Sequence, residues 1–146
     1  MTNHWLQALL KPSSIAILGA SQKSGSVGNE VILNLVRGGF EGEIFGINPS
    51  YGEVEGIPCY PSLAQLPKAP QHVIFAINDH RIEAALDEVV SLGIPACTIF
   101  SALIISDDST PNLKQRIATK AQDAGLLVAG ANGMGFYNVR DRVLAG

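Results

Sequence analysis

The segment from Ser14 to Gly28 constrains this chain more than any other part, because it joins a short apolar run to a glycine-rich turn. The run Ile15 to Leu18 is typical of a buried strand, and residues 27–37 carry the amphipathic pattern of a helix. Such a unit points the free N–H groups of the helix into the turn. These donors carry about half a positive charge and attract phosphate. The segment therefore predicts a site for a nucleotide or another phosphate-bearing cofactor.

The rest of the chain repeats this alternation of apolar strands and helical patterns. Strands are predicted at residues 14–18, 43–47, 72–77, 96–100 and 126–129. Helices are predicted at residues 4–10, 27–37, 61–66, 81–92 and 111–124, whereas residues 51–58 are expected to be turn-rich. Such alternation is typical of a parallel sheet covered on both faces. We therefore expect an α/β fold with a Rossmann-like, doubly wound parallel sheet, as a single domain over residues 1–146.

Composition excludes several functional classes. A net charge of −3 provides no broad basic surface for nucleic acid. No apolar run approaches the roughly 20 residues of a membrane span, and no apolar signal-peptide segment opens the chain. Cys59 and Cys97 are too few for a disulfide framework and lack zinc-site spacing. We therefore expect buried free thiols in a cytoplasmic protein.

The candidate ligand contacts follow the predicted strands, because ligands of such sheets bind beyond the carboxyl ends of the strands. These loops are residues 19–28, 48–52, 78–80, 101–106 and 130–135. The first loop offers hydroxyls at Ser21, Ser24 and Ser26 and a cation at Lys23, which suits a pyrophosphate or a 3′-phosphate. The alternative is a plain surface loop in which Ser26 serves as the N-cap of the helix.

The glycine pattern departs from the dinucleotide-binding motif. That motif has GxGxxG and an acidic residue about 20 positions on, which holds a ribose. Here the glycines are Gly19, Gly25 and Gly28, and the second strand ends in Asn48-Pro49 without a carboxylate. NAD is therefore disfavoured, and an NAD(P)-binding domain of a redox enzyme or sensor is kept as an alternative.

Taken together, these motifs resemble the CoA-binding domain of the ADP-forming acyl-CoA synthetases, which the succinyl-CoA synthetase alpha subunit shares. The resemblance rests on Gly19-Ala20-Ser21 with Gly25-Ser26-Val27-Gly28, on Asn48-Pro49, and on Gly130-Ala131-Asn132 with Gly135, and it covers about residues 10–140. It implies a domain that binds CoA or an acyl-CoA ester across the strand ends. The contacts that it implies are Gly19, Ala20, Ser21, Lys23, Gly25, Ser26, Val27, Gly28, Asn48, Pro49, Tyr51, Ile77, Asn78, Ser101 and Asn132.

The resemblance also implies how the cofactor lies. The Gly19–Gly28 loop would follow the phosphates and the pantetheine, whereas Asn48-Pro49 and Tyr51 would border the adenosine. Asn132 would lie near the thiol.

The chain departs from the family pattern at several of these loops. Asn78-Asp79 replaces a Pro-Ala pair and Leu103 replaces a glycine, and in the last loop Ala131 replaces a proline and Gly133 a cysteine. If the Asp79 carboxylate faces the phosphates, we expect it to weaken CoA binding.

No catalytic constellation appears in the chain. His72 is expected to be structural, whereas His80, at the ligand edge, is either a loop or first-turn helix residue or a contact to a phosphate or an acyl group. Residues 140–142 are expected to be a solvated tail. In the family, acyl transfer uses a phosphorylated histidine in a following domain. The resemblance therefore implies the N-terminal, binding part of a larger synthetase whose catalysis lies in further domains or a subunit. A stand-alone CoA-binding module is the alternative.

Overall fold

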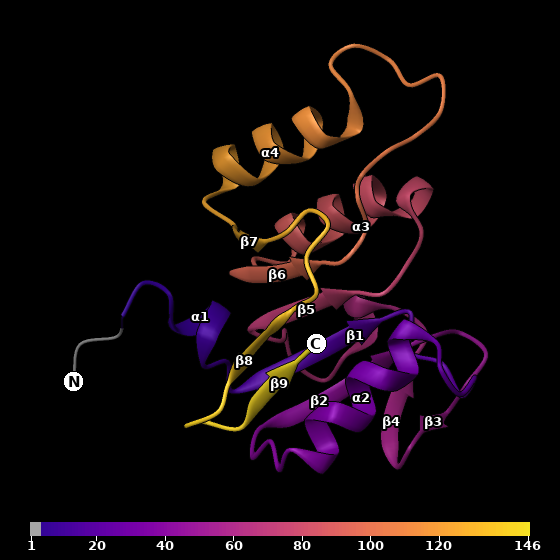
Figure 1. The fold of residues 1–146 in the computed structure, drawn as a ribbon, viewed down its shortest axis with the longest axis vertical. Helices are drawn as coiled ribbons and strands as arrows, with labels where there is room; N and C mark the ends of the chain where they lie inside the picture. Colours follow the sequence, from indigo (N-terminus) through magenta and orange to yellow (C-terminus); the bar gives the residue numbers. More distant parts are fainter. Residues whose placement is uncertain (1–3) are drawn as a thin grey trace.

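The structure is a computed structural model that describes residues 4–146, and it has the expected α/β fold (Figure 1). Its strands are β1 (Ser14–Leu18), β2 (Glu43–Ile47), β3 (Glu53–Val54), β4 (Ile57–Tyr60), β5 (His72–Phe75), β6 (Ala96–Ile99), β7 (Leu127–Ala129), β8 (Phe136–Asn138) and β9 (Val143–Ala145). Its helices are α1 (Gln7–Leu10), α2 (Val27–Arg37), α3 (Asp79–Ser91) and α4 (Leu113–Ala124), with a 3₁₀ turn η1 at Leu63–Gln65.

The main sheet has the strand order β3-β4-β2-β1-β5-β6-β7. Every pairing is parallel except that of β3 with β4. From β1 the chain moves outward to β2 and β4, and it then crosses to the other side of β1 to form β5. The strand order therefore reverses beside β1, and the crevice of a doubly wound sheet forms at such a point.

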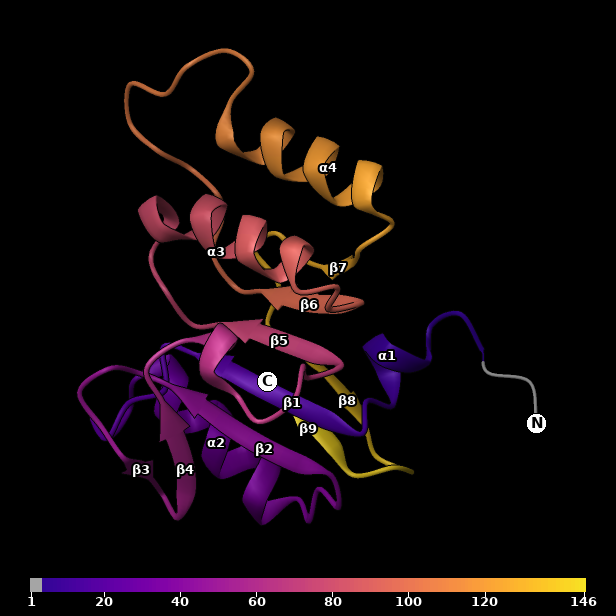
Figure 2. The ribbon, with the colours of Figure 1, turned by 180° about the vertical axis from the view of Figure 1, so that it is seen from behind.

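Side chains of successive residues in β1 point to opposite faces of the sheet, so one strand contributes to two cores. Ile15 and Ile17 pack with α2 and β9 on one face. Ala16 and Leu18 pack with α3 and α4 on the other. α2 and the β8–β9 hairpin lie in front of the sheet in Figure 1, whereas in Figure 2 α3 lies in front of it and α4 lies above α3 at the top of the molecule. This three-layer arrangement confirms the expected covering of both faces.

The two outer helices begin at other residues than predicted, and only α4 has a side-chain cap. Asn112 forms a capping box with Gln115, so α4 begins at Leu113 rather than at the predicted residue 111. α4 ends at Gly125, which takes a left-handed conformation with φ of 66°. α3 begins at Asp79, two residues before its predicted start at residue 81.

Two hairpins were not predicted from the sequence. The segment expected to be turn-rich contains β3 and β4, joined by Glu55 and Gly56 with φ of 50° and 80°. Residues 140–142, expected to be a solvated tail, are instead part of the turn between β8 and β9, in which Arg140 and Arg142 are exposed. Val143 and Ala145 are buried in the cluster that includes the apolar side chains of α2, because alternate residues of a strand point to the same face.

The β8–β9 hairpin also holds the first helix. Asn138 donates through Nδ2 to the carbonyl of Leu10 at 3.0 Å, and Lys11 pairs with Asp141 at 3.4 Å. α1 is shorter than the predicted residues 4–10 and packs near β6 and β7. Within residues 4–146, no helix is long and apolar enough to cross a membrane.

Candidate functional site

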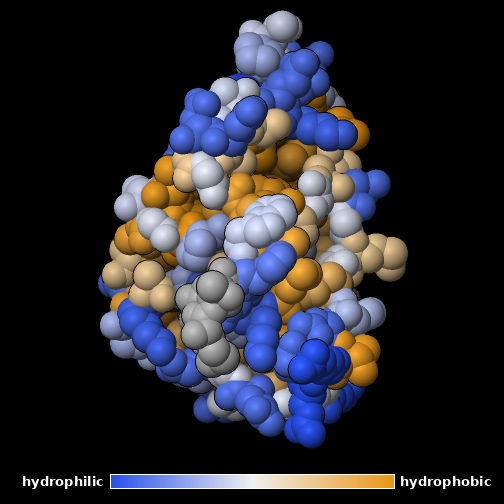
Figure 3. Space-filling model, turned by 90° about the vertical axis from the view of Figure 1, so that its left-hand side faces the viewer, coloured by the Kyte–Doolittle hydropathy of each residue, from blue (hydrophilic) through white to orange (hydrophobic). Residues whose placement is uncertain are grey.

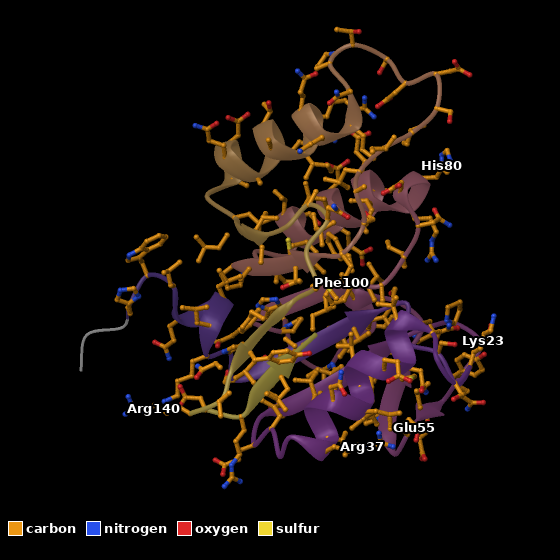
Figure 4. The ribbon with its side chains drawn as sticks, viewed as in Figure 1. Lys23, Arg37, Glu55, His80, Phe100 and Arg140 are labelled. Carbon is orange, nitrogen blue, oxygen red and sulfur yellow. The ribbon has the colours of Figure 1, made fainter. Side chains whose placement is uncertain are left out.

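The loops that carry the predicted contacts meet at one edge of the sheet, because they all follow parallel strands. They are the loops after β1, β2, β5, β6 and β7. In Figure 4, Lys23 and His80 project from this edge, whereas Arg140 lies at the opposite edge. We call it the C-terminal edge of the sheet.

Two glycines allow the first loop to pass close to the sheet. A Cβ atom at Gly19 would lie 2.2 Å from the carbonyl oxygen of Ala76, and Gly19 has φ of 94°. A Cβ atom at Gly28 would lie 2.0 Å from the carbonyl oxygen of Gly19. Both positions therefore require glycine for packing. Gly25 differs, because a Cβ atom there would meet nothing within 4 Å although φ is 83°. Gly25 is thus the open point of the loop.

Ser26 organises the turn and caps α2. Its hydroxyl donates to the carbonyl of Lys23 at 2.7 Å and accepts the N–H of Asn29 at 3.4 Å. Ser26 is therefore the N-cap of α2, as the alternative interpretation of this loop had it, and its hydroxyl is engaged within the protein. None of the hydrogen bonds found among residues 4–146 uses the N–H groups of Val27 and Gly28. Two donors at the front of α2, of exposed Val27 and buried Gly28, are therefore without a protein partner in the described part of the chain, as an anion site requires.

Asn48 and Asn29 act within the protein framework. Asn48 donates through Nδ2 to the carbonyl of Ala20 at 2.9 Å and accepts the N–H of Ser50 at 2.8 Å. Asn29, buried at the start of α2, donates through Nδ2 to the carbonyl of Ser21 at 3.0 Å and to Glu55 at 3.1 Å. These amides fix the first loop to its neighbours, which explains the asparagine after β2 without a ribose contact.

A cavity of about 350 Å³ opens beside the point where the strand order reverses. Its walls include the apolar side chains of Leu18, Ile47, Pro49, Leu63 and Ile77, with His80, Arg81 and Glu88 among the polar lining residues. Of the predicted contacts, Pro49 and Ile77 line it. Leu63 and Arg81 were missed, because they lie outside the predicted strand-end loops: η1 belongs to the crossover from β4 to β5, and α3 belongs to the crossover from β5 to β6.

The loops after β6 and β7 support each other at the far end of the edge. The N–H of Asn132 donates to the carbonyl of Ser101 at 2.6 Å. Asp79 accepts the N–H of Leu103 through Oδ1 at 3.1 Å. The carboxylate of Asp79 is therefore bonded to the loop after β6. Leu103 has φ of 59°, a conformation that costs a non-glycine residue about 1 kcal/mol.

The hydroxyl of Ser101 is the one buried side-chain polar atom without a hydrogen-bond partner among residues 4–146. A buried hydroxyl without a partner is unfavourable, and such groups in native proteins call for a specific explanation. A ligand group at this edge would supply the missing partner.

The remaining predicted contacts differ in access. Ala20 is buried in the core on the α2 side, and Tyr51 packs against that core. Lys23, Val27 and Asn78 are exposed.

His72 is structural, as expected. It is buried, with Nδ1 3.1 Å from the carbonyl oxygen of Ala8 and Nε2 2.7 Å from Oγ1 of Thr98. A carbonyl only accepts, so Nδ1 carries the proton and Nε2 accepts from the threonine. Burial lowers the pKa of His72 to about 4, although the bond to Ala8 acts in the opposite direction.

Both cysteines are free, but only Cys97 is buried as expected, whereas Cys59 is partly exposed. Burial raises the pKa of Cys97 to about 12. Burial and the nearby Glu53 raise the pKa of Cys59, which is only partly buried. Thiols with raised pKa values are poor nucleophiles.

A cavity of about 600 Å³ lies where the strands begin, on the side shown in Figure 3. That side is a mosaic of hydrophilic and hydrophobic residues. Four of the charges in its lining pair with each other, Lys11 with Asp141 at 3.4 Å and Arg142 with Glu41 at 3.7 Å. This cavity is larger than the one beside β1, but its larger volume alone does not identify it as the ligand site. Residues 4–146 contain no cluster of metal-ligating side chains.

Known proteins resemble this chain over nearly all its length. A family model described as the CoA binding domain matches residues 13–138. A trans-feruloyl-CoA synthase from an unknown prokaryotic organism is 30% identical over 144 residues, which are 97% of this chain and 20% of that protein. The ADP-forming acetate–CoA ligase I of Archaeoglobus fulgidus is 28% identical over 134 residues, which are 91% of this chain and 19% of that ligase. The chain thus spans about a fifth of the length of these relatives.

A solved structure shares the fold closely. The dinucleotide-forming acetyl-coenzyme A synthetase 1 of Ca. Korarchaeum cryptofilum, solved with phosphate and ADP, superimposes with a TM-score of 0.87 at 25% identity. The match covers 96% of this chain and 30% of that chain.

Proposed function

We propose that this chain, which belongs to the CoA binding domain family, supplies the CoA or acyl-CoA site of a larger ADP-forming acid–CoA ligase. The observation that carries the proposal is the match of the family model to residues 13–138. The relatives named as CoA ligases match over nearly this whole chain yet are several times longer. The nucleotide-binding and catalytic parts would therefore belong to further domains or to a separate subunit.

The site residues fit a CoA-like ligand. Free N–H groups at Val27 and Gly28 suit the diphosphate, and the open position at Gly25 leaves room for it. The apolar cavity between Leu18, Pro49 and Ile77 suits a flat adenine ring. The unpartnered hydroxyl of Ser101 suits an amide of the pantetheine arm. CoA would thus run along the C-terminal edge from β2 toward β6.

The residues of this chain would bind and orient the cofactor. A CoA thiol near the loops after β6 and β7 would face the parts of the ligase that carry the acyl group. The hydrogen bond from Asn132 to the carbonyl of Ser101 would hold these two loops together at that end.

Isothermal titration with CoA and with NAD tests the proposal. We expect CoA to bind and NAD to bind little, because Asn48 is engaged with Ala20 and Ser50 and no carboxylate follows β2 to hold a ribose. An NAD affinity equal to or above that of CoA would overturn the assignment in favour of a redox domain.

A matched pair of glycine variants tests the place of the phosphates. Gly25→Asp would put a negative charge beside the free N–H groups, so we expect it to abolish CoA binding. Gly93→Asp is the control, because Gly93 also has a positive φ of 70° and open space around it but lies between α3 and β6, at the opposite edge. Circular dichroism should show both variants folded. Unchanged CoA affinity in Gly25→Asp would place the phosphates elsewhere.

A further inference from the structure

We infer that Asp79 is a positioning residue, which holds the loop after β6 so that the Ser101 hydroxyl meets the pantetheine arm of CoA. The inference rests on the proposed function and adds to it. It concerns a residue whose position in the first turn of α3 has a simpler explanation, because acidic side chains there favour the helix dipole. That explanation leaves the direction of the side chain unaccounted for.

The side chain reaches from one strand-end loop to the next. Oδ1 of Asp79 accepts the N–H of Leu103 at 3.1 Å, across 24 positions of sequence. Asp79 makes no side-chain cap for its own helix, whose N-cap is Asn78. The carboxylate therefore ties the first turn of α3 to the loop after β6.

The loop after β6 needs this hydrogen bond from Leu103 to Asp79. Leu103 is only 5% exposed and has φ of 59°, so a buried N–H and a left-handed backbone occur at the same residue. Without Asp79 this N–H would lose the only partner found for it among residues 4–146. The carbonyl of Ser101, two residues earlier, accepts from Asn132, so the loop is held from both sides.

Between these two ties the Ser101 hydroxyl has no partner. A loop that is braced on both sides and still leaves one buried hydroxyl free is preorganised for a ligand group. Because β6 lies two strands from β1, this hydroxyl is remote from the phosphates at the first loop. The part of CoA that reaches it is the pantetheine arm.

The inference predicts a loss that depends on the ligand. Asp79→Ala should weaken CoA binding roughly tenfold, which is the scale of one hydrogen bond to a charged group. Adenosine 3′,5′-bisphosphate, which lacks the pantetheine arm, should bind the variant and the unaltered protein within about twofold. Asp79→Asn keeps an oxygen acceptor and should restore most of the CoA affinity. Titration calorimetry with both ligands measures these differences.

A charge control separates positioning from repulsion. Asp123→Ala removes the same charge from an exposed position near the end of α4 and should leave both affinities unchanged. If Asp79 acted by repelling the phosphates, Asp79→Ala would tighten both ligands, and that result overturns the inference. An equal loss of affinity for CoA and for adenosine 3′,5′-bisphosphate also overturns the inference. If the unaltered protein bound no CoA, the proposed function itself would fail.

Discussion

A single buried histidine shows how one residue connects the first helix to the sheet. His72 begins β5, yet its ring lies between the carbonyl of Ala8 in α1 and the hydroxyl of Thr98 in β6. Nδ1 donates its proton to the carbonyl of Ala8, and the unprotonated Nε2 accepts the hydrogen bond from the Thr98 hydroxyl. A second proton on the ring would place a charge in the core and put two donors against each other at Thr98 unless its hydroxyl turned.

This arrangement predicts a stability that falls in mild acid. The folded pKa of His72 is about 4 and its ordinary value is 6.5, so the unfolded chain binds more protons between these values. The free energy of unfolding should therefore drop as pH is lowered through this window, by about 3 kcal/mol in total. Urea unfolding at pH 7, 6 and 5 measures the slope.

Glu83 and Asp108 have lowered pKa values because they accept hydrogen bonds, Glu83 first from Arg116 and Asp108 first from Leu113, so they titrate below 4.5 and 3.8. The stability that these two ionised carboxylates contribute is lost only at a pH below the window in which His72 acts. His72→Gln should flatten the dependence between pH 5 and 7, and an unchanged slope in this variant would assign it to another group.

At the scale of elements, the β8–β9 hairpin completes the layer that α2 begins. Its anchors are spread over the chain: Asn34 of α2 donates to the carbonyl of Gly146 at 2.5 Å, and Asn138 donates to that of Leu10. Val143 and Ala145 fill the face of the sheet beside α2. The hairpin is therefore held both by α2 and by the end of α1.

Two neighbouring glycines test the close packing at the start of this hairpin. A Cβ atom at Gly135, where φ is 85°, would lie 2.0 Å from the carbonyl oxygen of Ala145. Gly135→Ala should therefore lower the free energy of unfolding by more than about 2 kcal/mol. Gly133→Ala is the control, because the nearest atom to its Cβ would be 3.6 Å away. Urea unfolding compares them, and equal stabilities would mean that the hairpin does not need this approach.

At the scale of the whole molecule, the candidate site belongs to no single element. Its groups come from the ends of β1, β2, β5 and β6, and these strands are neighbours in the central part of the sheet. Unfolding the sheet would disperse them. A ligand bound there is therefore coupled to global unfolding rather than to the fraying of one loop.

The increase in the free energy of unfolding follows from the ligand concentration relative to its Kd. CoA at a free concentration of 100 times its Kd should raise the free energy of unfolding by about 2.7 kcal/mol. Differential scanning fluorimetry should show a Tm that rises with CoA concentration, while Gly25→Asp should show no rise. The Tm could also stay unchanged at CoA concentrations where calorimetry shows binding. That result would mean that CoA binds the unfolded chain as well as the folded one.

The sequence by itself determined the α/β class, most helix and strand positions and the edge at which the predicted contacts gather. Periodicity and glycine placement are local properties, and parallel strands bring their carboxyl ends together whatever their order. The β3–β4 turn carried a signal that could have been used, because Glu55-Gly56 separates two short apolar-containing segments.

Tertiary structure alone decided which distant groups meet. The bond from Asp79 to Leu103, the cavity beside Arg81 and the burial of β9 against α2 join residues far apart in the chain. Composition and spacing carry no record of these distances, because they follow from the strand order and from the crossover beside β1. Asp79 is the clearest case: its charge is visible in the sequence, but the direction of its side chain exists only in the folded protein.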